Sequence, residues 1–292
     1  MASTIVLKRR IGSIKNTRQI TKAMQLVSAS KLRRAQEYAA ASRAYADLAT
    51  ELLTTLSGIR EVEREPLFAR RPVHSRLYVV ITSNSGLAGA YNANVLKQLT
   101  SSLQADRDAK VHSQVIAIGS KGAQFIRRLA EVELLAVYPA YGDQPTANDT
   151  RPLLNTIIER YKAETTDEVR VLSTKFISTV SQTAESQQLL PAQAVQTADA
   201  GNVVAGTVSN FEPDVETVID QVTIRLIEAQ VWQAVLESIA SEHAMRMVAM
   251  KNATDNAKEL IDDYTLELNT ARQAAITQEL AEITGGAEAL NG

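Results

Sequence analysis

Cysteine is absent from this chain of 292 residues. Without a thiol, the chain has no disulfide, no thiolate metal site and no cysteine nucleophile. No stretch approaches about 18 uncharged apolar residues, so the sequence predicts no membrane-spanning helix. Aromatic residues make up only 4% of the chain, while Ala, Leu, Ile and Thr are used heavily. This bias favours long helices over a β-sandwich.

Groups that carry chemistry in other proteins are few and scattered here. The three histidines, His74, His112 and His243, share no metal-ligand spacing. Asp262 and Asp263 are neighbours on a predicted helix and therefore point apart, which excludes an acid–base pair. Nothing resembles a nucleophile with its activating base. The sequence therefore predicts a chain that is not an enzyme by itself and has no catalytic residue, metal site or cofactor.

Two glycine-containing loops follow predicted strands, as phosphate-binding loops do. One is Ser83–Asn92 (SNSGLAGAYN) and the other is Gly119–Gly122 (GSKG). Neither fits the motif of a P-loop or of a dinucleotide-binding turn. An ordinary turn between a strand and a helix is the favoured interpretation, and nucleotide binding stays open as the alternative.

The net charge of −2 hides a strong asymmetry between the two ends of the chain. Residues 1–60 hold eleven basic and three acidic residues, a net of +8, and residues 212–292 hold five basic and fifteen acidic residues, a net of −10. Opposite charges suggest that the two ends meet. A cleaved targeting peptide and a nucleic-acid-binding arm are alternatives for the basic end. An unbroken apolar pattern argues against the first, and the lack of interleaved aromatic residues argues against nucleic acid.

Apolar spacing predicts a long helix at each end of the chain. Residues 3–59 read as one helix with a coiled-coil seam, whose steps are mostly three and four. The seam residues are Ile20, Met24, Val27, Ala35, Tyr38, Ala41, Tyr45, Leu48, Leu52, Leu56 and Ile59. Gly58 and Pro66 mark its end.

The second long helix runs without Gly or Pro from Val215 to Thr284. At about 1.5 Å per residue it spans about 105 Å, more than a globule of this mass, so we expect it to project. Heptads sustained over this length imply a left-handed supercoil. Its seam is predicted to include Val222, Leu226, Ala229, Leu236, Ile239, His243, Met247, Met250, Ala257, Leu260, Tyr264 and Leu268.

Strands and helices alternate in the middle of the chain, which predicts an α/β domain with a largely parallel sheet. The expected strands are residues 77–81, 111–118, 132–137 and 168–178, and the expected helices are residues 92–105, 123–130 and 150–165. Residues 181–210 read as a loose strand and a loop.

Three blocks carry a resemblance to a known family. They are Lys8–Gln36 (KRRIGSIKNTRQITKAMQLVSASKLRRAQ), the Ser83–Asn92 loop, and Ser241–Leu290 with its stretch Ala271–Leu280 (ARQAAITQEL). Along nearly its whole length the chain resembles the gamma subunit of F-type ATP synthases, of bacterial type. It departs from the family's loop pattern at Asn84, Ser85, Ala88, Ala90 and Tyr91 and from its usual aromatic at Leu268, but it keeps Gly86 and Gly89.

The resemblance implies a long antiparallel left-handed coiled coil of the N- and C-terminal helices plus a central Rossmann-like α/β domain. The expected parts are residues 1–60, 75–200 and 212–287. The implied function is the central rotor shaft, which couples proton flow through the membrane c-ring to ATP synthesis or hydrolysis. Implied partners are the α and β subunits of the catalytic ring, the epsilon subunit and the c-ring, with one copy of this chain per complex.

The resemblance also implies contact residues and a location. Arg272, Gln273, Thr277 and Glu279 match positions that touch the catalytic ring, and Met24 and Arg246 match the coupling region lower on the shaft. The implied location is peripheral, on the cytoplasmic face of a bacterial plasma membrane. The alternative function is an α/β ligand-binding module with coiled-coil dimerisation arms.

Overall fold

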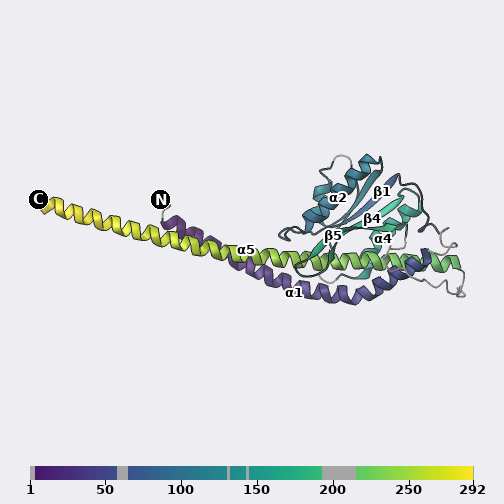
Figure 1. Cartoon of the computed structure of the whole chain (residues 1–292), viewed down its shortest axis with the longest axis horizontal. Coiled ribbons are helices and arrows are strands. Elements are labelled where there is room, and N and C mark those ends of the chain that lie inside the picture. The colour runs from purple at the N-terminus through teal and green to yellow at the C-terminus, as the bar shows by residue number, and fades with distance from the viewer. Residues whose placement is uncertain (1–3, 58–64, 130–131, 143–144, 193–214, 292) are drawn as a thin grey trace. The chain divides into compact units, whose positions relative to one another are not determined.

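A computed structural model describes residues 4–57, 65–129, 132–142, 145–192 and 215–291 (Figure 1). The elements are, in chain order, α1 (Thr4–Ser57), β1 (Ser75–Ile81), α2 (Tyr91–Asp108), β2 (His112–Ile118), α3 (Ser120–Ile126), β3 (Glu133–Tyr138), the 3-10 helix η2 (Ala147–Thr150), α4 (Arg151–Lys162), β4 (Glu168–Phe176), β5 (Gln182–Leu190) and α5 (Val215–Asn291). The chain divides into a paired-helix unit, residues 1–28 with 247–292, and a sheet unit, residues 29–246. No helix among the described residues has the length and hydropathy that crossing a membrane requires.

The sheet unit contains one five-stranded sheet in the order β3-β2-β1-β4-β5. The first four of these strands run parallel, and β5 joins the edge antiparallel to β4. The predicted α/β domain with a largely parallel sheet is therefore confirmed. Within the predicted loose segment 181–210, residues 182–190 form a regular nine-residue strand, and residues 193–210 lie outside the described residues.

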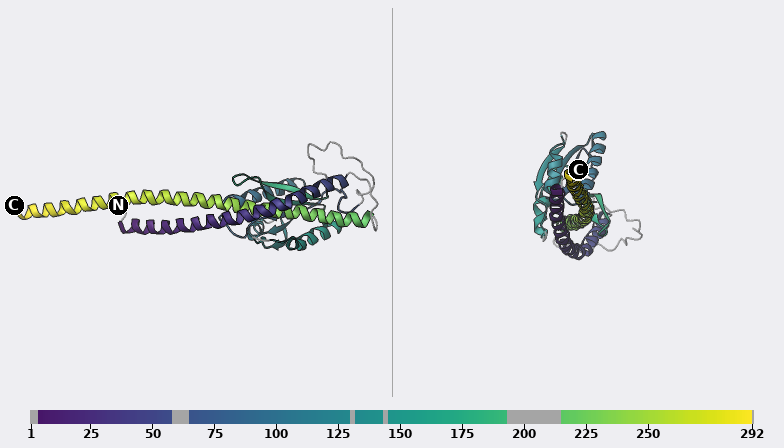
Figure 2. Two further views of the ribbon diagram at one scale, coloured as in Figure 1. Left: turned by 90° about the horizontal axis from the view of Figure 1, so that it is seen from below. Right: turned by 90° about the vertical axis from the view of Figure 1, so that its left-hand side faces the viewer.

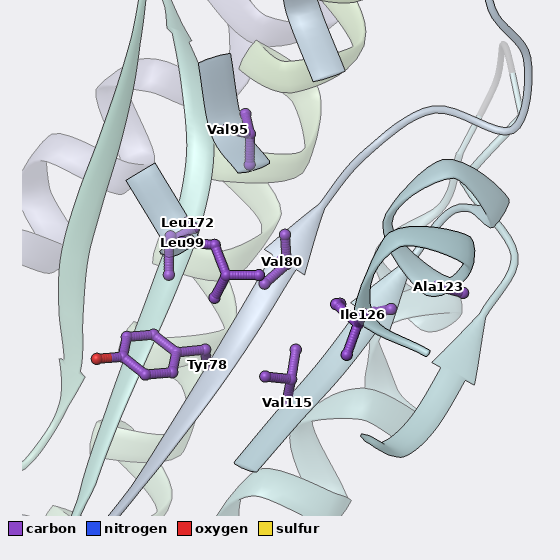
Figure 3. Packing of buried hydrophobic residues seen from close by; sticks show 9 residues of the cluster. Tyr78, Val80, Val95, Leu99, Val115, Ala123, Ile126 and Leu172 are labelled. Atoms are coloured by element: carbon purple, nitrogen blue, oxygen red, sulfur yellow. The ribbon is translucent and has the colours of Figure 1, made fainter. Parts of the chain in front are cut away.

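Apolar side chains of the strands and of two short helices form the core of the sheet unit (Figure 3). Tyr78 and Val80 of β1 stand beside Val115 of β2, with Leu172 of β4 in the same cluster. Helix α2 adds Val95 and Leu99, one turn apart, and α3 adds Ala123 and Ile126. The alternation of strand residues and the turn spacing of helix residues give each element one apolar face, which accounts for the packing.

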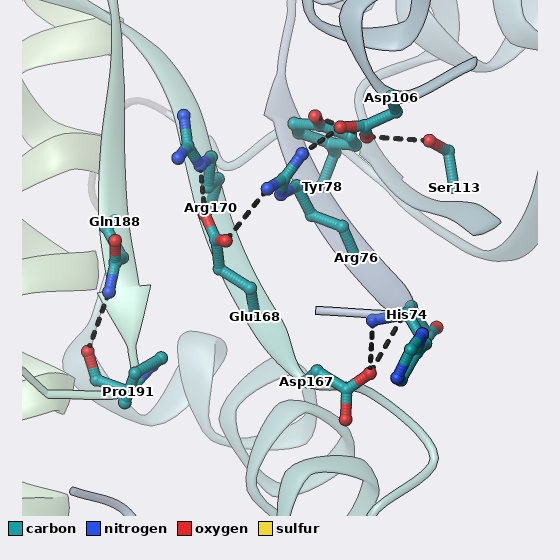
Figure 4. A network of polar contacts seen from close by, with 11 residues as sticks. His74, Arg76, Tyr78, Asp106, Ser113, Asp167, Glu168, Arg170, Gln188 and Pro191 are labelled. Carbon is teal, nitrogen blue, oxygen red and sulfur yellow. Dashed lines mark hydrogen bonds and ion pairs between the residues drawn. The ribbon is translucent and has the colours of Figure 1, made fainter. Parts of the chain in front are cut away.

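Charged groups are buried where β1, β2 and β4 begin (Figure 4). The Asp106 carboxylate accepts hydrogen bonds from the Tyr78 hydroxyl (2.7 Å) and the Ser113 hydroxyl (2.8 Å), and pairs with Arg76. Arg76 Nη2 also lies 2.9 Å from Glu168 Oε2. The other carboxylate oxygen of Glu168 pairs with Arg170. Buried charges are tolerated when they are paired in this way. Burial raises the pKa of Tyr78, although Arg76 and Arg170 oppose the rise.

Part of α5 in the sheet unit is buried on all sides. Every residue from 235 to 241 is buried, which the 3.6-residue period of an amphipathic helix does not produce. On one side α1 contributes Arg43, 3.3 Å from Glu237, and Thr50, which accepts a hydrogen bond from Gln230. On another side lies the sheet. The helix is thus a core element of this unit.

In the paired-helix unit, α1 and α5 lie side by side and run antiparallel (Figure 2). The Thr254 hydroxyl donates to the Thr21 hydroxyl over 2.8 Å, and the Arg10 guanidinium lies 5.9 Å from the centre of the Tyr264 ring. Residues nearer the N-terminus of α1 therefore contact residues nearer the C-terminus of α5. The predicted antiparallel pairing is confirmed in this unit.

The predicted seam of α1 is wrong in its phase. Most of its large residues are exposed: Ile20, Val27, Tyr38, Tyr45, Leu48 and Leu52. Ala35 of the predicted seam is buried, but most buried positions lie one residue after a predicted one or on the same row, and most are small: Leu7, Ile11, Thr21, Ser28, Leu32, Ala39, Ala46 and Ala49. Small side chains let two helix backbones approach closely, so they form the contact although the larger residues give the stronger pattern. The predicted seam of α5 holds in part: Leu226, Ala229, Leu236, Ile239, His243, Met250 and Ala257 are buried, whereas Val222 and Leu260 are exposed. Because every position from 235 to 241 is buried, burial there does not distinguish a seam.

Candidate functional site

Successive strands are added on one side of β1 and then on the other, so the strand order reverses between β1 and β4. The chain leaves β1 for β2 and β3 on one side, then crosses to β4 on the other. In doubly wound folds, ligands bind outside the carboxyl ends of the strands at such a switch point. Here the segment 82–90 follows β1 at this edge, and the neighbouring strand β4 ends beside it.

Helix α5 contacts the end of β4 through two hydroxyl groups. The Thr174 amide donates to Ser238 Oγ over 3.1 Å, and the Ser241 hydroxyl donates to the Thr174 carbonyl over 3.2 Å. All three residues are buried. Burial, and then the nearby Glu242 charge, raises the pKa of the Tyr91 hydroxyl at the start of α2 strongly. Helix α5 therefore satisfies both backbone polar groups of Thr174.

Arg246 joins α5 to the loop after β1. Its guanidinium lies 2.7 Å from Glu242 Oε1, one turn earlier on the helix. It also donates to Ser85 Oγ over 3.2 Å and to the Gly86 carbonyl over 3.4 Å. Arg246 is 8% exposed, so this is a buried ion pair with extra hydrogen bonds, the condition under which such pairs hold. We call Ser85, Gly86, Thr174, Ser238, Ser241 and Arg246 the α5 joint.

Two asparagines stiffen the same loop. Asn92 Oδ1 accepts a hydrogen bond from the Ser83 amide over 3.0 Å. Asn84 Oδ1 accepts from the Ser120 amide (3.1 Å) and from the Ala140 amide (3.2 Å). A single side chain therefore connects the loops that follow β1, β2 and β3.

The amide groups of the GSKG loop are committed to the protein itself. The Gly122 amide donates to Thr82 Oγ1 over 2.9 Å, and the Lys121 amide donates to the Ser83 carbonyl over 3.1 Å. Gly119 has φ of 92°, and a Cβ there would lie 2.2 Å from the Thr82 carbonyl oxygen. The glycine is therefore required by close approach of two loops. Phosphate loops need donors that point at the ligand, so this geometry favours the ordinary turn over nucleotide binding.

A polar pocket of about 480 Å³ lies in the sheet unit between α1, the β4–β5 hairpin and α5. Glu185 and Glu237 both line it, together with Arg43 and Lys175. Burial raises the pKa of Glu185, Lys175 opposes the rise, and the charge of Glu237 adds to it. The described residues contain no cluster of His, Asp or Glu fit to hold a metal ion.

The residues predicted as contacts fall in both units. Arg246 lies in the α5 joint of the sheet unit, whereas Met24 is half-buried on α1 in the paired-helix unit. Four more are exposed on α5 in the paired-helix unit: Arg272, Gln273, Thr277 and Glu279. The Thr277 hydroxyl bonds the Gln273 carbonyl of its own helix over 3.0 Å, so these two are one turn apart on one face.

Sequence reasoning missed most of the α5 joint. The sequence pattern does not mark Ser238 or Ser241 as contacts, and it places Thr174 only within a strand. A signal was present, because two serines three residues apart in a helix otherwise rich in apolar residues mark one polar face. Their partner on β4 is more than sixty residues away, which no local pattern indicates.

A family model described as ATP synthase matches residues 3–290 of the chain. A protein named ATP synthase gamma chain from Psychrobacter arcticus is 40% identical over 294 residues, with both chains fully covered. A protein of the same name from Herpetosiphon aurantiacus is 43% identical over 300 residues, again with both fully covered.

Solved structures show a similar fold. One is the central stalk and c-ring of the mitochondrial ATP synthase of Tetrahymena thermophila, with a TM-score of 0.60, 22% identity and coverage of 80% of this chain and 99% of that one. Another is the OSCP/F1/c-ring part of the Euglena gracilis enzyme in rotational state 3, with a TM-score of 0.67, 19% identity and coverage of 98% and 94%. At these identities the likeness is one of fold.

Proposed function

Since the chain belongs to the ATP synthase family, with bacterial gamma chains as full-length relatives, we propose that it works as the central rotor shaft of an ATP synthase. In this role it is a stalk subunit rather than a catalytic one. It couples proton flow through a membrane ring to ATP synthesis or hydrolysis at a catalytic ring.

The α5 joint is the observation that carries the proposal beyond family membership. A shaft transmits torque only if the helix and the domain that drives it turn together. Within the sheet unit, residues 235–241 of α5 are all buried, and the helix is tied to β4 by Ser238 and Ser241 and to the loop after β1 by Arg246. Directional hydrogen bonds and a buried ion pair resist rotation of the helix about its axis in a way that apolar packing alone does not.

The partners follow from the same role. The α and β subunits of the catalytic hexamer surround the shaft, and the epsilon subunit and the membrane c-ring meet it elsewhere, with one copy of this chain per complex. The chain is peripheral, on the cytoplasmic face of the bacterial plasma membrane. Residues 1–60 and 212–287 serve as the shaft helices, and residues 75–200 serve as the α/β domain.

The contact residues have distinct roles in this account. Arg272, Gln273, Thr277 and Glu279 are exposed polar groups on α5 that make and break contacts with the catalytic ring. Their short or flexible side chains offer no deep apolar anchor, which suits a surface that must slide. Met24 and Arg246 act in coupling lower on the shaft.

Affinity purification from native membranes tests the proposal. An affinity tag on this chain should recover two larger ATPase chains, each in threefold molar excess, together with the small ring-forming membrane subunit. A tagged chain that is recovered alone or only as a homodimer, under conditions that keep ATPase activity in the same membranes, would contradict it.

A further inference from the structure

The side chain of Asn84 joins three loops at the carboxyl edge of the sheet. Its Oδ1 atom accepts hydrogen bonds from the Ser120 amide over 3.1 Å and from the Ala140 amide over 3.2 Å. Its Nδ2 atom lies 3.5 Å from the Ala140 carbonyl oxygen. Asn84 belongs to the loop after β1, whereas Ser120 comes just after β2 and Ala140 just after β3. One exposed side chain is therefore fixed to two other parts of the sheet unit.

The two residues that follow Asn84 are the ones that Arg246 of α5 contacts. Arg246 Nη2 donates to Ser85 Oγ over 3.2 Å and to the Gly86 carbonyl over 3.4 Å. Because the side chain of Asn84 is fixed at two amides, its backbone is fixed as well, and with it the position of both acceptors. A force that α5 exerts through Arg246 thus reaches the loops after β2 and β3 by way of Asn84.

Other contacts of this loop lie before Asn84 or stay within the loop. The GSKG loop bonds to Thr82 and Ser83, which both precede Asn84. The Ser83 hydroxyl donates to the Ser85 carbonyl over 2.6 Å, which shapes the loop without joining it to another strand. Asn84 therefore anchors the part of the loop that contacts α5 to the side of the sheet that holds β2 and β3.

The loop needs an anchor because Leu87 is held in an unfavourable backbone conformation. Its φ of 61° lies in the left-handed region, which residues with a Cβ atom rarely adopt. Such a conformation persists only where the surrounding contacts over-determine it. Once the hydrogen bonds of Asn84 are lost, the loop relaxes, and the Ser85 and Gly86 acceptors move away from Arg246.

We propose that Asn84 is a positioning residue for rotary coupling. It holds the Ser85 and Gly86 acceptors in place, so that the Arg246 contact transmits force between α5 and the sheet. This inference rests on the proposed function, because only a shaft that turns against a load needs a stiff contact at this point. Asn84 acts through Arg246 and not through a contact of its own with another subunit.

Membrane vesicles that contain the full complex test the inference with three variants. Asn84→Ala removes both hydrogen bonds to the amides, and Asn84→Asp keeps an oxygen that accepts from both. Asn94→Ala is the matched control, which truncates an exposed asparagine on α2. With an uncoupler that collapses the proton gradient, the shaft turns without load, and ATP hydrolysis per assembled complex should equal that of the parent in all three.

Without the uncoupler, the proton gradient that ATP hydrolysis maintains should separate the variants. It should fall to about half or less in Asn84→Ala, because each hydrogen bond lost shifts the loop about fivefold toward its released form. Asn84→Asp should restore the gradient, and Asn94→Ala should leave it unchanged. A residue that only stabilises the fold would instead lower assembly, or lower hydrolysis with and without load alike.

A double-variant cycle shows whether Asn84 acts through Arg246. Arg246→Lys keeps a charge beside Glu242 but loses the guanidinium fork. If Asn84 acts through Arg246, adding Asn84→Ala to Arg246→Lys should lower the gradient no further, whereas independent effects would multiply.

The inference is overturned by multiplied effects, by equal gradients in Asn84→Ala and Asn94→Ala, or by failure of Asn84→Asp to restore the gradient. It is also overturned if Asn84→Ala does not assemble or lowers uncoupled hydrolysis in proportion to the gradient. These outcomes leave the rotor function standing. Failure of the unsubstituted chain to enter any ATPase complex would remove the proposed function, and this inference with it.

Discussion

The Thr254 hydroxyl donates a hydrogen bond to the Thr21 hydroxyl over 2.8 Å, between residues 233 positions apart in the chain. This contact sets the level at which α1 and α5 meet in the paired-helix unit. Arg10 and Tyr264 also meet. Arg10 precedes Thr21 on α1 by nearly the same number of residues as Tyr264 follows Thr254 on α5, as antiparallel helices require. By the same register, Met24 lies level with Met250, each about one turn from the threonine pair.

Engineered disulfides test this register. Thr21→Cys with Thr254→Cys should form a disulfide quickly under mild oxidation, because the atoms replaced by sulfur already lie within hydrogen-bond distance. Met24→Cys with Met250→Cys should form one more slowly. The control pair is Thr21→Cys with Thr265→Cys, which lies about 16 Å further along α5. Electrophoresis without reductant measures the yield, and a control pair that forms as fast as the first pair would show that the register is wrong.

The long helices were predictable from sequence, but the face of α1 that meets α5 was not. The sequence pattern weights large apolar residues, and Tyr38, Tyr45 and Leu48 formed a better row than Ala39 and Ala46. Burial instead favours the alanines, because a close helix pair has room only for small side chains. Two heptad rows one position apart both read as seams, and nothing local decides which one faces the partner.

Truncation of Arg246 should destabilise the sheet unit. Arg246→Ala removes the ion pair to Glu242 and the hydrogen bonds to Ser85 and Gly86, and breaking a buried pair costs about 3–5 kcal/mol. Ser85→Ala is the matched control, which removes one hydrogen bond worth about 0.5–1.5 kcal/mol. Urea unfolding followed by circular dichroism gives both values. If the two variants lose equal stability, Arg246 does not hold the joint as described.

Replacement of Glu185 should raise stability at neutral pH. Burial raises the folded-state pKa of Glu185 above its unfolded value, so the folded state holds the proton more tightly and ionisation disfavours folding. Glu185→Gln should therefore be more stable than the parent at pH 7, and the difference should vanish below about pH 4, where both states are protonated. Urea midpoints of the two proteins across this range provide the test.

Glu133 provides a control of opposite sign. Hydrogen bonds from Gln114 and then His112 lower the pKa of Glu133. Its contribution to stability is present above the unfolded pKa and is lost as pH falls through the folded pKa. Glu133→Gln should thus be less stable than the parent at pH 7. Two variants that shift in the same direction at pH 7 would contradict these assignments.

A charge at Met24 should disturb coupling more than folding. Met24 is half-buried, so Met24→Lys can extend its ammonium group to solvent or to an acidic group of the surrounding ring. A new ion pair at about 4 Å contributes about 1–4 kcal/mol, and it forms in some rotational positions and not in others. Each 1.4 kcal/mol by which the ion pair stabilises one rotational position slows the departure of the shaft from that position about tenfold.

Hydrolysis and proton pumping, measured in the same membrane vesicles, check this prediction. The Met24→Lys complex should assemble, keep measurable ATP hydrolysis and lose much of its pumping and synthesis. Met24→Leu is the matched control and should retain both. A strictly proportional fall of hydrolysis and pumping, or failure to assemble, would make Met24 a packing residue only.

The candidate site was predictable in part. Sequence reasoning identified Arg246 and the Ser83–Asn92 loop, each within a recognisable block, but not that they bond to one another. That contact joins residues 161 positions apart, and it depends on the path of α5 across the sheet. Exposed polar groups such as Arg272 and Glu279 have no fixed partner among the described residues of the chain, so their role depends on the subunits around them.

Direct observation of rotation tests the central claim most closely. The complex is fixed to a surface by its catalytic ring, and a light-scattering rod is attached to Ser101→Cys, an exposed position on α2 in this otherwise cysteine-free chain. With ATP, the rod should turn continuously in one direction, with a pause for each catalytic site in every turn. A rod that stays still while the same complexes hydrolyse ATP at their normal rate would contradict the rotor function.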